Sequence, residues 1–174
     1  GKGRLYDRMS GGLLYDGDFV NDKWHGKGIS YDGGRLWYDG DFAENKWHGK
    51  GKRYSRETEK LIYDGDFEKG KYRGKGRLYD RMSGGLLYDG DFVNDKWHGK
   101  GISYDGGRLW YDGDFAENKW HGKGKRYSRE TEKLIYDGDF EKGKYHGKGR
   151  LYDSVSGRLM YDGDFAEGKY HGKG

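Results

Sequence analysis

The pentapeptide Tyr-Asp-Gly-Asp-Phe occurs seven times in this chain, and its recurrence constrains the fold more than any other feature. Its copies contain all seven phenylalanines. They occupy residues 15–19, 38–42, 63–67, 88–92, 111–115, 136–140 and 161–165. A period of about 20–50 residues is typical of repeat proteins, in which one small supersecondary structure stacks on the next. The chain is therefore expected to form an array of similar units.

The units are delimited by Gly-Lys-Gly, and we predict a single array over residues 1–174. They are 1–25, 26–48, 49–73, 74–98, 99–121, 122–146 and 147–171, with a terminal stub at 172–174. Residues 1–73 and 74–146 are identical except that Arg73 becomes His146. This near-identity favours an engineered array or a very recent duplication.

Each unit contains two short runs with the character of β-strands. Residues 13–19 read Leu-Leu-Tyr-Asp-Gly-Asp-Phe, in which every second side chain belongs to one face, as in a strand. Residues 23–31 form the second run and carry two glycines, which within a strand mark a bend or the close approach of a bulky group. The pattern predicts one β-hairpin per unit.

The turn between the two runs ends in Gly, Asn or Asp, as at residues 43–45 and 68–70, and these types tolerate a left-handed backbone. A type I′ turn would also force Glu44 or Lys69 to positive φ, so we predict a three-residue loop with one left-handed residue and a bulge. This odd-length loop would let all the tyrosines share one face despite the odd length of each unit.

The composition excludes a conventional packed core, since 32% of the residues are hydrophobic, 37% are charged and 35 residues are glycine. No stretch keeps the period of an amphipathic helix. The absence of cysteine excludes disulfides and thiolate metal sites. With no signal peptide and no apolar run of about 20 residues, we expect a soluble protein, cytoplasmic by default, although the sequence does not indicate a compartment.

We predict an all-β fold, an elongated single-layer antiparallel β-meander of stacked hairpins, solenoid-like and twisted or curved into a groove. A lone hairpin is unstable, so each must pack on its neighbours, with aromatic rings covering the bare backbone of glycines. The Tyr and Phe of each pentapeptide would then form an aromatic ridge along one face, and we predict that this ridge is the partner-binding surface. The aromatic ridge comprises Tyr15, Phe19, Tyr38, Phe42, Tyr63, Phe67, Tyr88, Phe92, Tyr111, Phe115, Tyr136, Phe140, Tyr161 and Phe165.

The repeated aspartates and histidines invite a catalytic or metal-binding interpretation, which we reject. Catalysis needs one asymmetric constellation, and Asp16 and Asp18 recur equally in every unit. We expect them to pair across strands with residues such as Lys27 and His25. A histidine row spaced by two strands, about 9–10 Å, is too open for zinc, and its members are expected to pack near the aromatic residues and bond to aspartates. We therefore expect no enzyme, no cofactor and no metal.

The repeated unit resembles the MORN repeat, whose units have the form Tyr-x-Gly-x-aromatic-x-x-Gly-x-x-His-Gly-x-Gly. Departures are small: Arg73 replaces the histidine, and Asn or Asp often replaces the turn glycine. The latter are Asp22, Asn45, Asp95 and Asn118. The resemblance implies one hairpin per repeat, a long single-layer sheet often curved into a groove, and a role in binding or scaffolding. Peptide or helix docking, self-association and phospholipid binding are attributed to the family.

These observations favour a non-catalytic repeat scaffold for protein–protein interaction, with an aromatic groove suited to a peptide or an amphipathic helix. The partner would be a protein or peptide, or a second copy pairing through sheet edges. A phospholipid-binding module and an edge-to-edge self-assembling protein remain as alternatives. The net charge of +4 comes from interleaved acidic and basic residues, so no nucleic-acid partner is expected.

Overall fold

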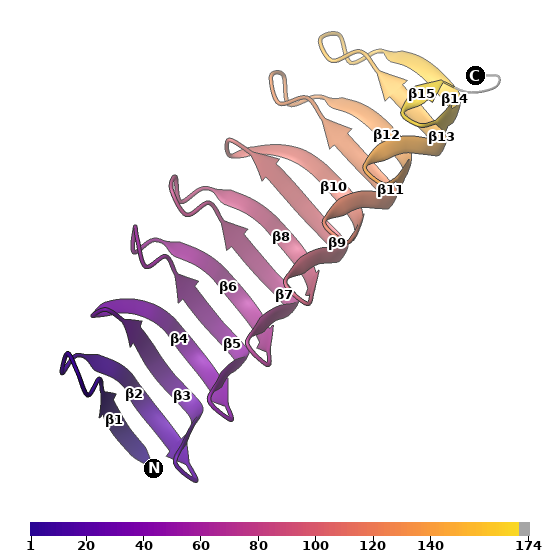
Figure 1. Cartoon of the computed structure of the whole chain (residues 1–174). Coiled ribbons are helices and arrows are strands. Elements are labelled where there is room, and N and C mark those ends of the chain that lie inside the picture. Colours follow the sequence, from indigo (N-terminus) through magenta and orange to yellow (C-terminus); the bar gives the residue numbers. More distant parts are fainter. Residues whose placement is uncertain (171–174) are drawn as a thin grey trace. The chain divides into compact units, whose positions relative to one another are not determined.

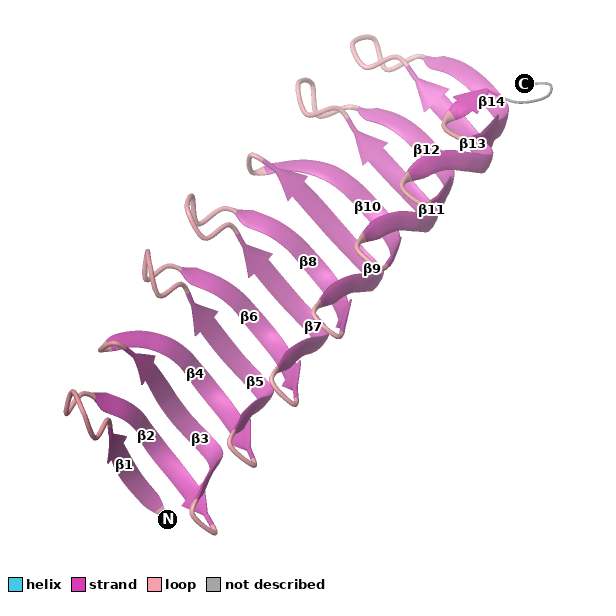
Figure 2. Ribbon diagram, viewed as in Figure 1, coloured by secondary structure: helices cyan, strands magenta, loops and turns pink. Residues whose placement is uncertain are grey.

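A computed structural model describes residues 1–170, which form strands, turns and loops without any helix (Figures 1 and 2). That part of the chain accordingly holds no helix able to cross a membrane. The chain divides into two compact units, each of which contains several of the repeats, and the two are described separately below. The first contains Gly1–Leu86 and Val93–Asp95, and the second contains Leu87–Phe92 and the residues from Lys96 onward. The predicted stub 172–174 lies outside the described residues.

Both units are open antiparallel meanders in which the strands follow one another in sequence order. The first contains β1 (Lys2–Tyr6), β2 (Leu13–Val20), β3 (Lys23–Asp32), β4 (Arg35–Ala43), β5 (Lys46–Tyr54), β6 (Leu61–Glu68) and β7 (Lys71–Tyr79). The second contains most of β8 (Leu86–Val93), then β9 (Lys96–Asp105), β10 (Arg108–Ala116), β11 (Lys119–Tyr127), β12 (Leu134–Glu141), β13 (Lys144–Tyr152), β14 (Leu159–Ala166) and β15 (Lys169–Tyr170). The predicted all-β single-layer meander is confirmed.

The hairpin turn is shorter than the sequence suggested. Val20 pairs with Lys23, so only Asn21 and Asp22 lie between β2 and β3, with φ of 50° and 62°. Two successive residues at positive φ are typical of a type I′ turn, whose twist matches the twist of the flanking strands. Even Glu44 takes this conformation, with φ of 51°. The predicted three-residue loop is wrong, because the strand pairing outweighs the local cost of a left-handed glutamate.

A bulge within the hairpin, rather than an odd-length loop, shifts the strand pairing so that the tyrosines can share one face. Gly17 pairs with Gly28, and Phe19 pairs with Trp24. The single residue between them on β2, Asp18, therefore lies opposite residues 25–27 of β3. Extra residues on one side of an antiparallel pair bend that strand sharply. The bend accounts for the curved strands in Figure 1.

A second bulge lies at the residue before the tyrosine in six of the pentapeptides. The pairing of β3 with β4 skips Trp37, which lies between Leu36 and Tyr38. Strict alternation would have placed this residue on the face of the aspartates. Instead, its ring meets the edge of Trp47 at a centroid distance of 5.1 Å, and Trp47 stacks on Tyr38 at 5.0 Å. Trp37 and its counterpart Trp110, whose ring meets that of Trp120 at 5.0 Å, thus join the aromatic face. Leu14 occupies the equivalent skipped position in the pairing of β1 with β2.

A row of glycines crosses the strands beneath the tyrosine rings. In the first unit it comprises Gly3, Gly17, Gly28, Gly40, Gly51, Gly65 and Gly76. The hydroxyl of Tyr15 donates to the backbone carbonyl of Asp18 at 2.8 Å. A Cβ on Gly28 would lie 2.3 Å from the same hydroxyl oxygen, so only glycine fits. Rings resting on bare backbone, as predicted, form the base of the core.

Candidate functional site: the aromatic face

The aromatic ridge is the buried core of each unit. Tyr15 stacks on Trp24 with centroids 4.5 Å apart, and the rings of Phe19 and Phe42 meet it edge-on, each at 5.1 Å. Edge-to-face and stacked pairs are the favoured geometries of aromatic rings and add about 0.5–1.5 kcal/mol each beyond burial. Rings of consecutive repeats thus enclose one another, which explains how a single layer shields them.

Burial follows the position of each ridge residue in the array. The tyrosines without exposed surface are Tyr15, Tyr38, Tyr63, Tyr88, Tyr111 and Tyr136. The phenylalanines that are at most 3% exposed are Phe42, Phe67, Phe92, Phe115, Phe140 and Phe165. Phe19 and Tyr161 are half-buried. The ridge is brought together as expected, and its role in binding stays a prediction.

The tryptophans that follow four of the hairpin turns stack on the ridge tyrosines and keep part of their surface accessible. Trp24 and Trp47 in the first unit are half-buried, as are Trp97 and Trp120 in the second. Sequence reasoning did not include them in the ridge. The available signal was the recurring Lys-Trp-His-Gly, in which Tyr72 takes the tryptophan position and stacks on its own ridge tyrosine at 3.9 Å.

Burial also sets the ionisation of the ridge tyrosines. It raises the pKa of Tyr15 to about 12, and the neighbouring carboxylate of Asp18 adds to the effect. The same cause raises the pKa of Tyr38 and Tyr111. These hydroxyls are therefore neutral donors near neutral pH, each bound to a backbone carbonyl, and are unsuited to act as acids or bases.

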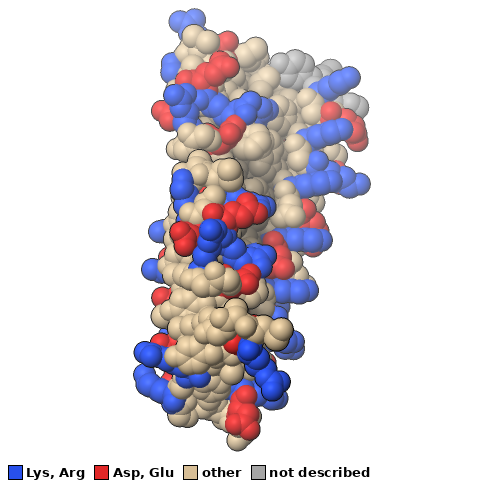
Figure 3. Space-filling model, turned by 60° about the vertical axis from the view of Figure 1, so that its left-hand side comes forward, with Lys and Arg blue, Asp and Glu red and all other residues tan. Residues whose placement is uncertain are grey.

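The opposite face carries the charges. Lys27 pairs with Asp41, and Lys50 pairs with Asp66 at 2.5 Å, which confirms the predicted cross-strand ion pairs. Burial raises the pKa of Asp41, but its bonds to the ammonium of Lys27 and the backbone N–H of Lys50 outweigh this and lower it. Figure 3 shows basic and acidic side chains interleaved on the face in view. Exposed pairs of this kind are screened by solvent and contribute little to stability.

The histidines do not bond to aspartates among the described residues, contrary to expectation. The Nδ1 atom of His48 accepts a bond from the backbone N–H of Lys69 at 3.5 Å, and Nε2 of His146 lies 3.2 Å from Glu141. No group of three potential metal ligands occurs in residues 1–170. His171, the last member of the expected row, lies outside the described residues.

The asparagines and aspartates at the turn join consecutive repeats. The side-chain oxygen of Asn45 accepts a bond from the backbone N–H of Trp24 at 2.7 Å, and Asp95 accepts from Tyr72 at 2.8 Å. The backbone N–H of Asn45 also donates to the carbonyl of Trp24 at 3.0 Å. A turn glycine can make only the backbone bond. These departures from the repeat pattern thus add a side-chain bond between hairpins.

The family model for the MORN repeat matches seven segments of the chain, one for each pentapeptide. The matched segments are residues 15–35, 38–56, 63–84, 88–108, 111–129, 136–158 and 161–174. The chain belongs to the MORN-repeat family. Each match starts at the tyrosine that the geometry places over the glycine row, and the MORN repeat is generally a non-catalytic module. A search of curated proteins finds no match.

Proposed function

We propose that this MORN-repeat chain is a non-catalytic scaffold that binds a peptide or amphipathic helix across its aromatic face. The observation that carries the proposal is the segregation of side chains. Lysine–aspartate pairs occupy one face, while Tyr, Phe and Trp occupy the other. Accessible aromatic surface is enriched in partner-binding sites.

The proposed contact surface has two levels. The aromatic ridge is its floor, because six of its seven tyrosines have no exposed surface. The partner would contact the half-buried side chains above and beside the floor, such as Leu14, Trp24 and Trp47. Because these positions recur in every hairpin, the surface offers similar contacts at each repeat, which suits a partner with regularly spaced apolar anchors.

The recurrence also supports a non-catalytic role. The repeats present similar aspartate pairs, and in each the tyrosine hydroxyl donates to the backbone carbonyl of the aspartate three residues later, as Tyr15 does to Asp18. Such equivalent groups lack the asymmetric arrangement of nucleophile, base and orienting residue that catalysis requires.

The test is a titration of the protein with a synthetic amphipathic helix whose apolar face carries Leu and Phe, followed by tryptophan emission. We expect saturable binding that Leu14→Ser weakens about tenfold, since burial of one such side chain is worth about 1.5–3 kcal/mol. The control is Lys27→Ser on the charged face, which should bind like the parent protein.

Equal weakening by both variants, or no saturation with the peptide, would contradict the proposal. Flotation with anionic vesicles is the complementary measurement. Vesicle association that needs the lysines and falls with salt, without peptide binding, would favour the phospholipid alternative instead.

A further inference from the structure

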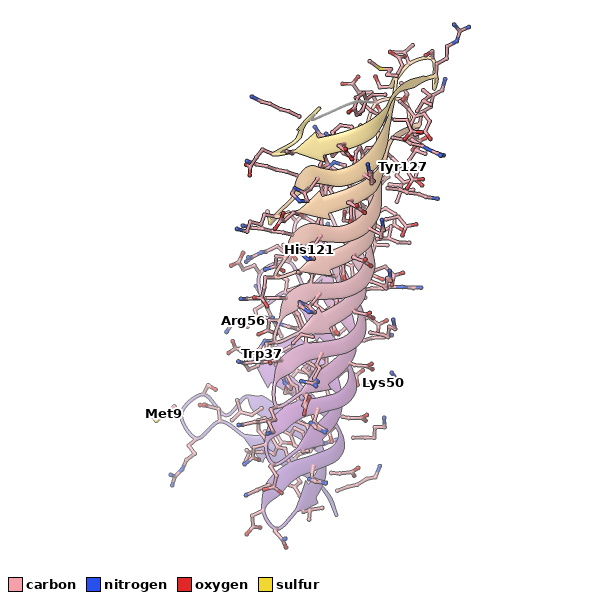
Figure 4. The ribbon with its side chains drawn as sticks, turned by 90° about the vertical axis from the view of Figure 1, so that its right-hand side faces the viewer. Met9, Trp37, Lys50, Arg56, His121 and Tyr127 are labelled. Carbon is pink, nitrogen blue, oxygen red and sulfur yellow. The ribbon has the colours of Figure 1, made fainter. Side chains whose placement is uncertain are left out.

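A cavity of about 300 Å³ lies at the loop end of the first unit, lined by more arginines than any internal ion pairing requires. Its lining comes from the strand ends that flank the turn between β3 and β4, from the end of β5 and the loop after it, from the start of β6, and from the loop after β7. The arginines are Arg35, Arg53, Arg56 and Arg81, and Trp37 contributes an aromatic wall. Figure 4 shows Trp37 and Arg56 together on the side of the ribbon opposite Lys50.

Three of the guanidinium groups are held in place by the protein. Arg35 donates through Nη1 to the backbone carbonyl of Arg56 at 2.6 Å. Arg56 bonds Asp32 at 2.5 Å, and its guanidinium carbon lies 5.3 Å from the ring centroid of Trp37. Arg53 donates to the hydroxyl of Tyr72 at 2.8 Å. Fixed guanidinium groups lose little entropy when they bind an anion, so the cavity is preorganised.

Donor capacity remains after these contacts. Each uses Nη1 alone, so the Nη2 groups of the three arginines have no acceptor within residues 1–170. The exposed Arg81 makes no ion pair within the same residues. Four arginines against the carboxylates of Asp32 and Glu57 leave the lining with a net charge of +2. That charge matches a dianion better than a monoanion.

The second unit repeats the arrangement with one change. Arg108 donates to the carbonyl of Arg129 at 2.6 Å, Arg129 pairs with Asp105, and Arg126 donates to the hydroxyl of Tyr145 at 2.9 Å. The position equivalent to Arg81 is Ser154, because the sequence diverges there. The chain thus contains its own comparison, in which the second cluster has one positive charge fewer.

We propose that the arginine cavity of the first unit binds the dianion of a phosphate monoester. Guanidinium groups match phosphate oxygens in charge and in planar donor geometry, and a volume of about 300 Å³ suits a small ligand. The cluster of the second unit binds the same group more weakly, because Ser154 replaces Arg81 there and supplies no guanidinium group. The cavity adjoins the surface proposed for a peptide partner, because Trp37 meets Trp47 with ring centroids 5.1 Å apart, but the anion proposal does not depend on a peptide binding there.

The experiment follows the indole N–H signals of Trp37 and Trp110 by NMR during titration with methyl phosphate. The Trp37→Phe and Trp110→Phe variants assign the two signals. We expect Trp37 to respond at about tenfold lower concentration than Trp110, since a charge-assisted hydrogen bond is worth about 1.5–3 kcal/mol. Arg81→Ser should remove the difference, and Ser154→Arg should bring the response of Trp110 to that of Trp37.

Acetate serves as a monoanion control, and phosphatidic acid vesicles serve as a control for a lipid surface. Acetate should shift Trp37 only at much higher concentration, because it carries a single charge. An equal response to acetate, identical responses of the two indoles to methyl phosphate, or none at either indole would overturn the proposal. A response to phosphatidic acid vesicles without one to methyl phosphate would also overturn it, and would point to a lipid surface as the phosphate source.

Discussion

Glycine determines how closely the aromatic ring approaches the sheet. At Gly51 the hydroxyl oxygen of Tyr38 would lie 2.1 Å from an added Cβ, and ring carbons would lie within 2.5 Å. The tyrosine can rest there only because the position has no side chain. Its hydroxyl then reaches the carbonyl of Asp41 at 2.7 Å, so burial of the ring and satisfaction of the backbone depend on the same glycine.

We predict that Gly51→Ala lowers the free energy of unfolding by about 1–3 kcal/mol or more, because the ring must move off the backbone. Urea denaturation measures the change. The matched control is Gly85→Ala, where an added Cβ meets only the hydroxyl of Ser83 at 3.4 Å. The control should stay within about 0.5 kcal/mol of the parent. A similar loss in both variants would show that the space beneath the ring is unimportant.

The packing of rings on glycine and the hairpin structure could be predicted from the sequence. The repeated Tyr-x-Gly and the second glycine pair indicated rings over bare backbone, and the strand runs indicated hairpins. The turn could not be predicted, because Glu44 disfavours positive φ by itself and adopts it only under the constraint of the strand ladder. The arginine cavity was missed because loops of consecutive repeats assemble it, including the non-repeating choice between Arg81 and Ser154.

At the scale of elements, each hairpin is tied to the one before it by its turn. Asn118 joins both backbone groups of Trp97, through a bond from the N–H of Trp97 to its side chain at 2.8 Å and a bond from its own N–H at 3.0 Å. At the next turn Gly143 makes only the backbone bond to Trp120, at 2.9 Å. The connection between neighbouring hairpins therefore varies along the array with one residue type.

We predict that Asn118→Gly costs about 0.5–1.5 kcal/mol of stability, the net value of one hydrogen bond, partly offset by the preference of glycine for positive φ. Gly143→Asn should act in the opposite direction, because asparagine tolerates this backbone and supplies an acceptor. Amide hydrogen exchange gives the specific readout: protection of Trp97 should fall in the first variant and that of Trp120 should rise in the second. Unchanged protection at Trp97 would contradict the role assigned to Asn118.

For the whole molecule, the ridge tyrosines couple stability to alkaline pH. The pKa of Tyr15 is raised to about 12 by burial, and those of Tyr38, Tyr63, Tyr88, Tyr111 and Tyr136 are raised by the same cause. An unfolded tyrosine releases its proton near pH 10. Above that pH the unfolded chain holds fewer protons than the folded one, so stability declines as pH rises.

We therefore predict full stability below about pH 10 and a progressive loss towards pH 12, at up to about 1.4 kcal/mol per pH unit for each buried tyrosine. Circular dichroism and tyrosinate absorbance should change together, because ionisation of the ridge requires unfolding. Tyr15→Phe removes one ionising group and should make the decline shallower. Ionisation of the ridge well before any loss of strand signal would contradict this coupling.

The loops that connect consecutive repeats have two lengths, but both begin and end at equivalent paired residues of the sheet. Residues 32–35 close on the pair Tyr31 and Leu36, and residues 7–12 close on Tyr6 and Leu13, with the tyrosine–glycine rows unchanged behind them. The difference in length between repeats is thus confined to these loops and does not change the positions of the aromatic rings. New peptide segments could be grafted there, one for each repeat, to display chosen sequences at regular intervals on a support that keeps its register.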